Sequence, residues 1–205
     1  MTSVPATTPS TAHPGRHRSA ACDATILDAT LEILVEKGYA GLTVAAVIER
    51  AGVSSATLYR RWATKQDLVA AAVATLAPEP AAVDTGSLEG DLKAFLANIA
   101  RSIAARREDV ADALGTEISA NTELAAALRE KFTAPRLTEL RGILASAKQR
   151  GELDDAPSAE QAYSLVAGGL YHQAFVQHQR ITPAFFRSAL AFALRGLGAR
   201  GPSSD

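Results

Sequence analysis

The sequence predicts an all-α protein of about nine helices, organised in two helical domains. Ile26, Leu27, Thr30, Leu31 and Leu34 share one face at i, i+3 and i+4 spacing, which is typical of an amphipathic helix. No segment shows the strict alternation of apolar and polar residues that marks a half-buried strand. Alanine is abundant and favours helix, but it fits either face and makes the inward side of a helix harder to identify.

The composition is that of a globular chain. Its 205 residues, 47% of them hydrophobic, suffice for one domain with a core or for two small domains that share an interface. No apolar run approaches the roughly 20 residues of a membrane span, and the N-terminus lacks the apolar stretch of a secretory signal. We therefore expect a cytoplasmic protein with no membrane partner. Cys22 is the only cysteine, which excludes an internal disulfide and a cysteine metal site.

Capping residues divide the first third of the chain into helices. Gly38 stands where a helix C-cap favours a left-handed residue. Thr43, Ser54 and Thr64 are side chains that cap helix N-termini, and Asp67 follows Thr64 by three residues as in an approximate capping box. The helices expected here lie near residues 20–37, 43–51, 54–62 and 64–76.

The rest of the chain begins with a linker. Residues 77–87 contain Pro78 and Pro80, which stop the fourth helix, and they end in Gly86. Later helices are expected near residues 88–106, 108–119, 122–150 (kinked or broken at Pro135), 158–179 and 183–198. The predicted organisation is a disordered arm at 1–19, whose polar composition cannot offset its ordering entropy, a domain at 20–76, and a second helical domain at 88–200.

Residues 43–62, TVAAVIERAGVSSATLYRRW, have the order of a helix-turn-helix. Gly52 supplies the turn, and Val53 is the apolar residue that fixes the turn to the core. The next residues, from Ser54 to Thr57, are small or polar, so the start of the following helix can approach DNA closely. Its free amides and positive dipole end favour phosphate. We therefore expect this second helix to enter the major groove of DNA.

Local charge supports the same prediction. Residues 50–66 hold Arg50, Arg60, Arg61 and Lys65 and no acidic residue, although the net charge of the chain is −1. Phosphate contacts need local rather than global positive charge. Adjacent helix positions lie about 100° apart, so only one of the two adjacent arginines is expected to point at the groove, and we assign Arg60.

The runs GYAGLTV and IERAGVSSATLYRRWATKQDL closely resemble the DNA-binding domain of TetR-type transcriptional regulators over residues 20–70. This resemblance implies operator binding by a DNA-binding domain of the three-helix, helix-turn-helix kind. Two positions depart from the family pattern: Ser55 stands where Lys or Arg is frequent, and Trp62 stands where Phe, Tyr or His is usual. The candidate DNA-contacting residues are Thr43, Ser54, Ser55, Ala56, Thr57, Tyr59, Arg60, Trp62 and Lys65.

Several of these residues have a simpler interpretation. Tyr59 can be an ordinary half-exposed aromatic, and an Arg-Arg pair is usually a solvated helix face. Trp62 can equally pack against the first helix or donate its indole N–H to a phosphate. The basic residues at 16–18 fit a plain tail or an arm that reaches into the minor groove.

The segments ELAAALREKFTAPRLTELRGILASAKQRGELDD and GGLYHQAF resemble one subfamily of TetR-type ligand-binding domains. Aromatic residues at helical spacing are more often core residues than ligand contacts, and His172 can be a core or interface histidine. Glu117 lies in an otherwise apolar helix and needs a partner if buried, either a cationic ligand or an arginine such as Arg101 or Arg141. The candidate effector pocket comprises Phe95, Asn98, Ile99, Ser102, Glu117, Phe132, Tyr163, Tyr171, His172 and Phe175.

The last two long helices are the candidate dimer interface. Gly168 and Gly169 lie inside a helix, where each glycine costs roughly 1 kcal/mol relative to alanine, and close approach of helices would explain them. The resemblance implies a four-helix interface between two protomers. Its candidate residues are Leu165, Gly168, Gly169, Phe185, Phe186, Ala189, Leu190, Ala193, Leu194 and Leu197.

Together these features predict a homodimeric regulator, acting as a repressor that a small-molecule effector releases from operator DNA. Nothing resembles a nucleophile elbow, a phosphate-binding glycine loop or a paired-carboxylate site, so we expect neither an enzyme nor a cofactor. His172 and His178 are six residues apart, which does not fit a helical metal pair, so no metal is expected. The alternatives are a DNA-binding regulator without an effector, and a helical ligand carrier or enzyme.

Overall fold

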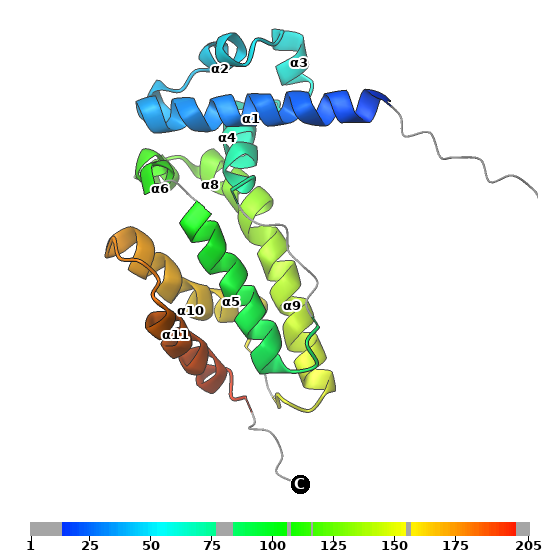
Figure 1. Cartoon of the computed structure of the whole chain (residues 1–205), viewed down its shortest axis with the longest axis vertical. Coiled ribbons are helices and arrows are strands. Elements are labelled where there is room, and N and C mark those ends of the chain that lie inside the picture. The colour runs from blue at the N-terminus through cyan, green and yellow to red at the C-terminus, as the bar shows by residue number, and fades with distance from the viewer. Residues whose placement is uncertain (1–13, 77–83, 106–107, 116, 155–156, 200–205) are drawn as a thin grey trace, which may run out of the picture.

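The structure, a computed structural model, describes residues 14–76, 84–105, 108–115, 117–154 and 157–199. Within these ranges it contains helices, turns and loops but no strand. Figure 1 shows the first helices stacked across one end of an elongated bundle of C-terminal helices. The predicted all-α fold class, with an N-terminal helix-turn-helix domain and a C-terminal helical domain, is confirmed.

The predicted caps organise the N-terminal helices. The Thr43 side chain accepts a hydrogen bond from the Ala46 amide at 3.2 Å, and Ser54 accepts one from Thr57 at 3.2 Å. Thr64 accepts one from the Asp67 amide at 3.0 Å. The helices are α1 (Pro14–Gly41), α2 (Val44–Ala51), α3 (Ser55–Tyr59) and α4 (Lys65–Ala74).

The first helix begins earlier than predicted, and a short helical segment follows its break at Gly38. It begins at Pro14, within the predicted arm, so residues 14–19 are helical. Residues 1–13 of the predicted arm lie outside the described residues. Gly38, at φ 67° and ψ 174°, interrupts the helical backbone where a C-cap was predicted, and one more turn follows before Gly41. A left-handed φ of this kind favours glycine.

The C-terminal helices follow the predicted order with two local differences. The expected helix 108–119 is divided after Leu114, and π-helical turns occur at 129–133 and 172–176. The first π turn precedes Pro135, which lies in the first turn of the next helix, where a missing amide is tolerated. The elements are α5 (Leu88–Ala105), α6 (Glu108–Leu114), α7 (Glu117–Ala120), α8 (Thr122–Leu128), η1 (Arg129–Thr133), α9 (Ala134–Gln149), α10 (Ala159–Tyr171), η2 (His172–Val176) and α11 (Pro183–Gly196).

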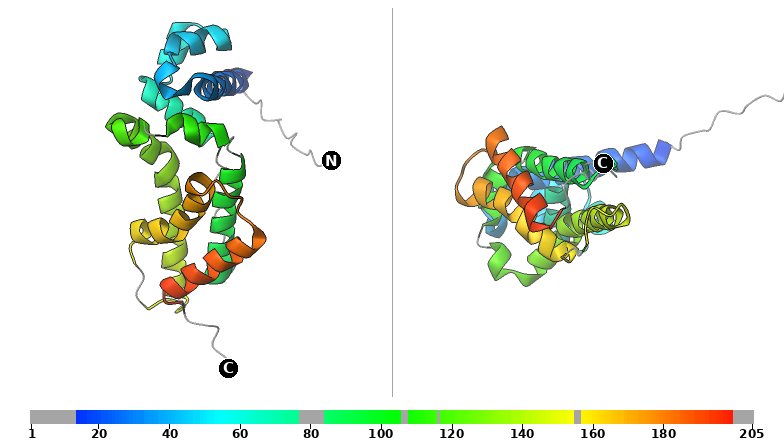
Figure 2. Two further views of the ribbon diagram at one scale, coloured as in Figure 1. Left: turned by 90° about the vertical axis from the view of Figure 1, so that its left-hand side faces the viewer. Right: turned by 90° about the horizontal axis from the view of Figure 1, so that it is seen from below.

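The upper hydrophobic core joins the two predicted domains. Val47, Leu58 and Leu68 are buried there with the inward residues of α1. Val110 from α6 and Leu124 from α8 belong to the same cluster, and α1 packs on α6 while α4 packs on α8. Figure 2 shows α6 and α8 directly beneath the N-terminal helices. The N-terminal helices are therefore anchored on C-terminal helices as well as on one another.

The lower hydrophobic core lies between α5, α9, α10 and α11. Phe95 is 1% exposed, and its ring meets that of Tyr163 edge-on with centroids 6.3 Å apart. Leu140, Leu170 and Leu190 fill the space from the three other helices. This core holds α5 rigidly, and one side of α5 borders the cavity described below.

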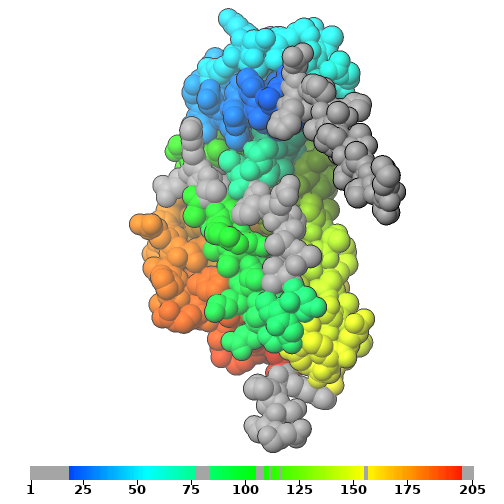
Figure 3. Space-filling view, turned by 45° about the vertical axis from the view of Figure 1, so that its right-hand side comes forward, coloured from blue at the N-terminus to red at the C-terminus, as the bar shows by residue number. Residues whose placement is uncertain are grey.

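A polar cluster closes the lower end of the molecule, where the start of α5 lies against the end of α9 (Figure 3). The Asp91 carboxylate, 1% exposed, accepts hydrogen bonds from the Thr85 amide at 2.6 Å and from Arg150 at 3.0 Å. Arg150 also pairs with Glu152, whose other oxygen accepts the Leu88 amide at 2.6 Å. Burial raises the pKa of Asp91 and of Glu152, but these hydrogen bonds outweigh it and hold both pKa values below the ordinary range.

This cluster is expected to make stability depend on acid. A carboxyl whose folded pKa is depressed contributes stability above its unfolded pKa and loses it as the pH falls through the folded pKa. The wild-type chain should therefore lose stability progressively below about pH 5. Asp91→Asn should cost about 2 kcal/mol at pH 7 and flatten this acid slope. Urea unfolding from pH 3 to 7 measures both, with Glu89→Gln, an exposed change on the same helix, as control. An unchanged slope in Asp91→Asn would contradict the assignment.

Candidate functional site

The segment predicted as a helix-turn-helix has that geometry. Gly52 ends α2 in a left-handed conformation at φ 64°, and its amide donates to the Glu49 carbonyl at 3.3 Å. The Val53 amide donates to the Ile48 carbonyl at 3.2 Å, and the Val53 side chain packs on the upper core. Gly52 therefore makes the turn and Val53 fixes it to the core, as the sequence predicted.

The α3 helix presents its outer face to solvent. Leu58 is 1% exposed and fixes α3 to the core, whereas Tyr59 is 54% exposed. Ser55 and Ala56 are exposed at the start of the helix. The Ser54 hydroxyl both caps the helix and lies 2.9 Å from the Thr57 hydroxyl. A short helix with small residues first and an aromatic hydroxyl last can approach the edges of base pairs.

The two adjacent arginines have different environments. Arg61 pairs with Asp23 of α1, donates to the Thr57 carbonyl at 3.0 Å and donates to the Ser19 hydroxyl at 3.1 Å. Its side chain is only 14% exposed. Arg60 is exposed and makes no hydrogen bond or ion pair within the described part of the chain. Its side chain is therefore free of the contacts that hold Arg61, and its contact with DNA stays a prediction.

The local positive charge is smaller than the sequence suggested. Arg50 binds both carboxylate oxygens of Glu36 at 2.8 Å and lies 3.8 Å from Glu32. Asp23 offsets Arg61 in the same way. The absence of acids between residues 50 and 66 did not reveal these pairs, because the neutralising carboxylates come from α1. This leaves Arg60 and Lys65 as the cations of this segment for phosphate contacts.

Lys65 is held against Tyr39 at the start of α4. Its ammonium donates to the Tyr39 carbonyl at 2.6 Å and lies 4.1 Å from the centre of the Tyr39 ring. Burial lowers the pKa of Lys65, and the Glu117 carboxylate opposes that shift. Trp62 is half-buried and packs on the upper core, which agrees with the packing alternative for this residue. Its indole contact with DNA remains a prediction.

Tyr39 also reaches the C-terminal helices. Its hydroxyl accepts a hydrogen bond from the Asn121 side chain at 3.5 Å, and Asn121 caps α8. Gln66, the residue after Lys65, donates a hydrogen bond to the Glu123 carboxylate at 2.9 Å. The two arginines suggested as partners of Glu117 pair elsewhere, Arg101 with Asn98 and Arg141 with Glu160. Glu117 instead acts electrostatically on Tyr39 and Lys65.

Half of the residues predicted for an effector pocket are buried in or packed against the lower core. Phe95, Ile99 and Ser102 are each 1% exposed. The hydroxyls of Tyr163 and Tyr171 lie 3.0 Å apart. These residues lie close together, but they are packed in or against the lower core and do not line the described cavity. His172 is exposed on the outer side, and among the predicted residues only Phe175 lines that cavity.

A buried charged residue in this region was not predicted. Arg136 is 7% exposed, donates to the Phe132 carbonyl at 2.7 Å and to Ser102 at 3.1 Å, and lies over the Phe132 ring at 3.9 Å. Burial raises the pKa of the nearby Glu139, and Arg136 opposes it. One Glu139 oxygen is buried with no hydrogen-bond partner among the described residues. Arg136 and Glu139 are three residues apart, about one helical turn, and this spacing of opposite charges was the signal that the sequence offered.

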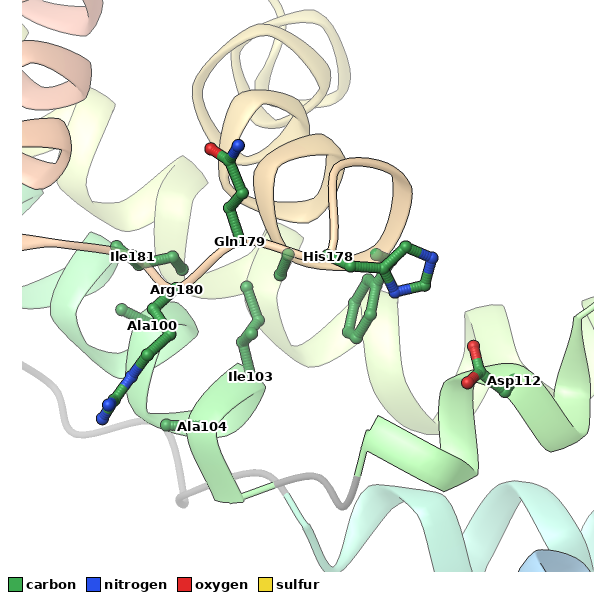
Figure 4. A pocket seen from close by; sticks show the side chains of 10 residues that line it. Ala100, Ile103, Ala104, Asp112, His178, Gln179, Arg180 and Ile181 are labelled. Carbon is green, nitrogen blue, oxygen red and sulfur yellow. The ribbon is translucent and has the colours of Figure 1, made fainter.

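The described cavity opens between α5, α6 and the segment that follows η2 (Figure 4), and it measures about 470 Å³. This volume lies within the range of small-molecule sites. One side is apolar and the rim carries polar side chains. The lining residues are Ala100, Ile103, Ala104, Asp112, Ala174, Phe175, His178, Gln179, Arg180 and Ile181.

The predicted dimer-interface residues fall into two groups. Leu190 and Ala193 are 8% and 4% exposed in the protomer's own core, and Phe185, Phe186, Ala189 and Leu194 pack against it. These residues contribute to the core of the protomer, as does Leu197 at 4% exposure, and their part in a dimer interface stays a prediction. Leu165 is 68% exposed on α10, beside the exposed Gly169 and the half-buried Gly168. Phe192, at 64% exposure on α11, and Val176, at 63%, also expose large apolar side chains.

Among the residues that the structure describes, no group of three potential metal-ligating side chains occurs. None of the helices in the described ranges combines the length and the apolarity that a membrane crossing needs.

Family models match both halves of the chain. Residues 26–72 match the model described as bacterial regulatory proteins of the tetR family, and residues 82–193 match the tetracyclin repressor-like C-terminal domain. The chain belongs to the TetR family. It is therefore a DNA-binding transcriptional regulator, and its resemblance to this family is confirmed.

Individual TetR-family relatives agree over most of the chain. The HTH-type transcriptional regulator YdeS of Bacillus subtilis is 29% identical over 90% of this chain and 94% of its own. Rv1556 of Mycobacterium tuberculosis, another HTH-type regulator, is 33% identical over 75% of this chain and 76% of its own. The crystal structure of the TetR family transcription regulator SCO0332 has a TM-score of 0.62 and 26% identity, covering 85% of this chain and 97% of that one.

Proposed function

We propose that this TetR-family regulator is a homodimeric repressor that binds a near-palindromic operator and is released by a small molecule. The observation that carries the DNA contact is the outer face of α3, where Tyr59 and Arg60 are exposed while Leu58 and Arg61 hold the helix against the core and α1. Repression accords with the family description of the C-terminal half as tetracyclin repressor-like. In this proposal the protein acts on operator DNA in the cytoplasm and is not an enzyme.

The homodimer brings two recognition helices to one face of the DNA. Two α3 helices about 34–36 Å apart, one helical turn of DNA, can engage two half-sites together. Leu165, Val176 and Phe192 expose apolar side chains on α10, η2 and α11. A contiguous exposed apolar patch is typical of a surface that binds a partner, and in this proposal the three side chains belong to one such patch. We assign this face to the second protomer.

The candidate DNA contacts have defined roles in this proposal. Thr43 and Ser54 cap α2 and α3, so their helix ends point amides at the phosphates. Ser55, Ala56 and Thr57 lie at the base edges, and Tyr59, Arg60 and Trp62 border the groove. Lys65 contacts a phosphate after exchanging part of its interaction with Tyr39.

Selection of bound sequences from random duplex DNA tests this proposal, using the full chain and then a salt titration of the selected duplex. We expect an inverted repeat. Lys65→Ala should weaken all duplexes alike and lower the salt slope by about one per protomer, because a phosphate contact is lost. Tyr59→Ala should weaken binding to the selected duplex more than binding to other duplexes.

The matched control is Lys93→Ala, which removes an exposed cation from α5 far from the helix-turn-helix. This variant should bind as the wild type does. Enrichment of no sequence, or equal losses in Lys65→Ala and Lys93→Ala, would contradict the proposed operator contact.

A further inference from the structure

We propose that the cavity between α5, α6 and residues 178–181 binds an amphipathic amine, with an apolar body inside and a protonated nitrogen at Asp112. This inference rests on the proposed effector-responsive function and specifies the chemistry of the effector. Three features of the cavity carry it: its apolar side, an acidic group at one end, and the position of that group on α6.

The apolar side of the cavity has the shape of a slot. Ala100 and Ala104 lie one turn apart on α5 and leave space between them, while Ile103 projects into it. Phe175 of η2 and Ile181 close the opposite wall. Burying an apolar body here releases water from surfaces that the protein leaves uncovered.

The acidic group lies at one end of this slot. Asp112 projects from α6 toward the cavity (Figure 4), and it has no hydrogen bond or ion pair within the part of the chain that the structure describes. Asp112 is exposed to solvent, and a ligand ammonium would replace water at its carboxylate with a charge-assisted hydrogen bond. A bound ligand also excludes water from the carboxylate, which strengthens that contact.

The other polar side chains of the cavity do not replace this role. Gln179 accepts a hydrogen bond from the Gln173 side chain at 2.8 Å. Arg180 lies at the end away from Asp112, and His178 faces the same opening as Asp112. His178 has a left-handed backbone at φ 50°, a conformation in which histidine is enriched among non-glycine residues. In the proposed complex this backbone conformation places the His178 imidazole beside the ligand nitrogen and outside the slot.

Asp112 also lies next to the contact between the effector domain and α1. A Cβ added to Gly38 would lie 4.0 Å from the carbonyl oxygen of Ala113, the residue that follows Asp112. Gly38 in turn precedes Tyr39, which holds Lys65. A ligand that binds the Asp112 carboxylate therefore acts on the segment of α6 that packs against the DNA-binding helices.

The experiment compares three probes of one skeleton: 4-phenylbutylamine, 4-phenylbutan-1-ol and 4-phenylbutanoate. Their dissociation constants for the full chain are measured by ligand-observed NMR at pH 7. We expect the amine to bind at least fivefold more tightly than the alcohol and the carboxylate to bind most weakly. Asp112→Asn should remove the preference for the amine and leave the alcohol unchanged. Phe175→Ala should weaken all three probes at least threefold.

Arg180→Gln is the matched charge-removing control, and it should not weaken the amine. The proposal is overturned if the carboxylate binds best and loses affinity in Arg180→Gln, if the three probes bind alike, or if none binds. Operator binding of each variant is measured separately. Probe binding without operator binding would count against the proposed regulator, whereas operator binding without the amine preference counts against this inference alone.

Discussion

Replacing Arg60 with alanine is expected to lower operator affinity by about a hundredfold, because a dimer loses two groove-facing guanidinium groups at about 1.4 kcal/mol each. Arg60 is exposed at the C-cap of α3 and makes no hydrogen bond or ion pair in the described part of the protein, so the free energy of unfolding should stay within about 0.5 kcal/mol of wild type. Fluorescence anisotropy with the selected operator measures the affinity.

The neighbouring Arg61 is the matched comparison. It joins α3 to α1 through Asp23, Ser19 and the Thr57 carbonyl, so Arg61→Ala should destabilise the DNA-binding domain by about 1–2 kcal/mol. Its effect on operator affinity should shrink when the temperature is lowered well below the unfolding midpoint. If Arg61→Ala weakened the operator without loss of stability, while Arg60→Ala did not, the face of α3 assigned to DNA would be the wrong one.

Phe192→Asp is expected to produce a monomer and to reduce operator affinity more than a hundredfold. The side chain is 64% exposed on α11, and a carboxylate there would have to be desolvated against a second copy of the same apolar face. A monomer also loses the high effective concentration that links the binding of two half-sites. Sedimentation velocity and operator titration measure the two consequences.

Ile118→Asp is the control for this change. Ile118 is 40% exposed on α7, away from α10 and α11, so the variant has the same added charge on a different surface. It should remain dimeric and bind the operator. A Phe192→Asp protein that still sedimented as a dimer would place the interface elsewhere.

The sequence predicted the local features of the DNA-binding end because they depend on near neighbours. Thr43, Ser54 and Thr64 cap helices through amides only three residues away, and Gly52 turns the chain by its own backbone conformation. Helical periodicity also predicted that Arg60 and Arg61 point in different directions, and the two side chains do have different environments. The pairing of Arg61 with Asp23 spans 38 residues, and no local pattern encodes it.

The cavity could not be predicted in the same way. On α5 the sequence favoured Phe95 and Ile99, which are large and apolar, but they fill the core. Ala100 and Ala104 line the cavity because small side chains leave space, and in an alanine-rich chain they give no distinct signal. The π turn of η2 ends at Val176 and shifts the register of the residues that follow, which depends on tertiary packing.

Lys65 lies at the junction with the effector domain, whereas Tyr59 and Arg60 lie on the outer face of α3. Contacts with phosphates position a protein on DNA but do not read its sequence. A displacement that reaches the DNA through Tyr39 and Lys65 would therefore multiply the affinity for every promoter by one common factor. The effector would then change the affinity for all operators by the same factor and leave the order of affinities among them unchanged. Sequence selection with and without effector would yield one consensus, and a different consensus would mean that α3 itself is reoriented.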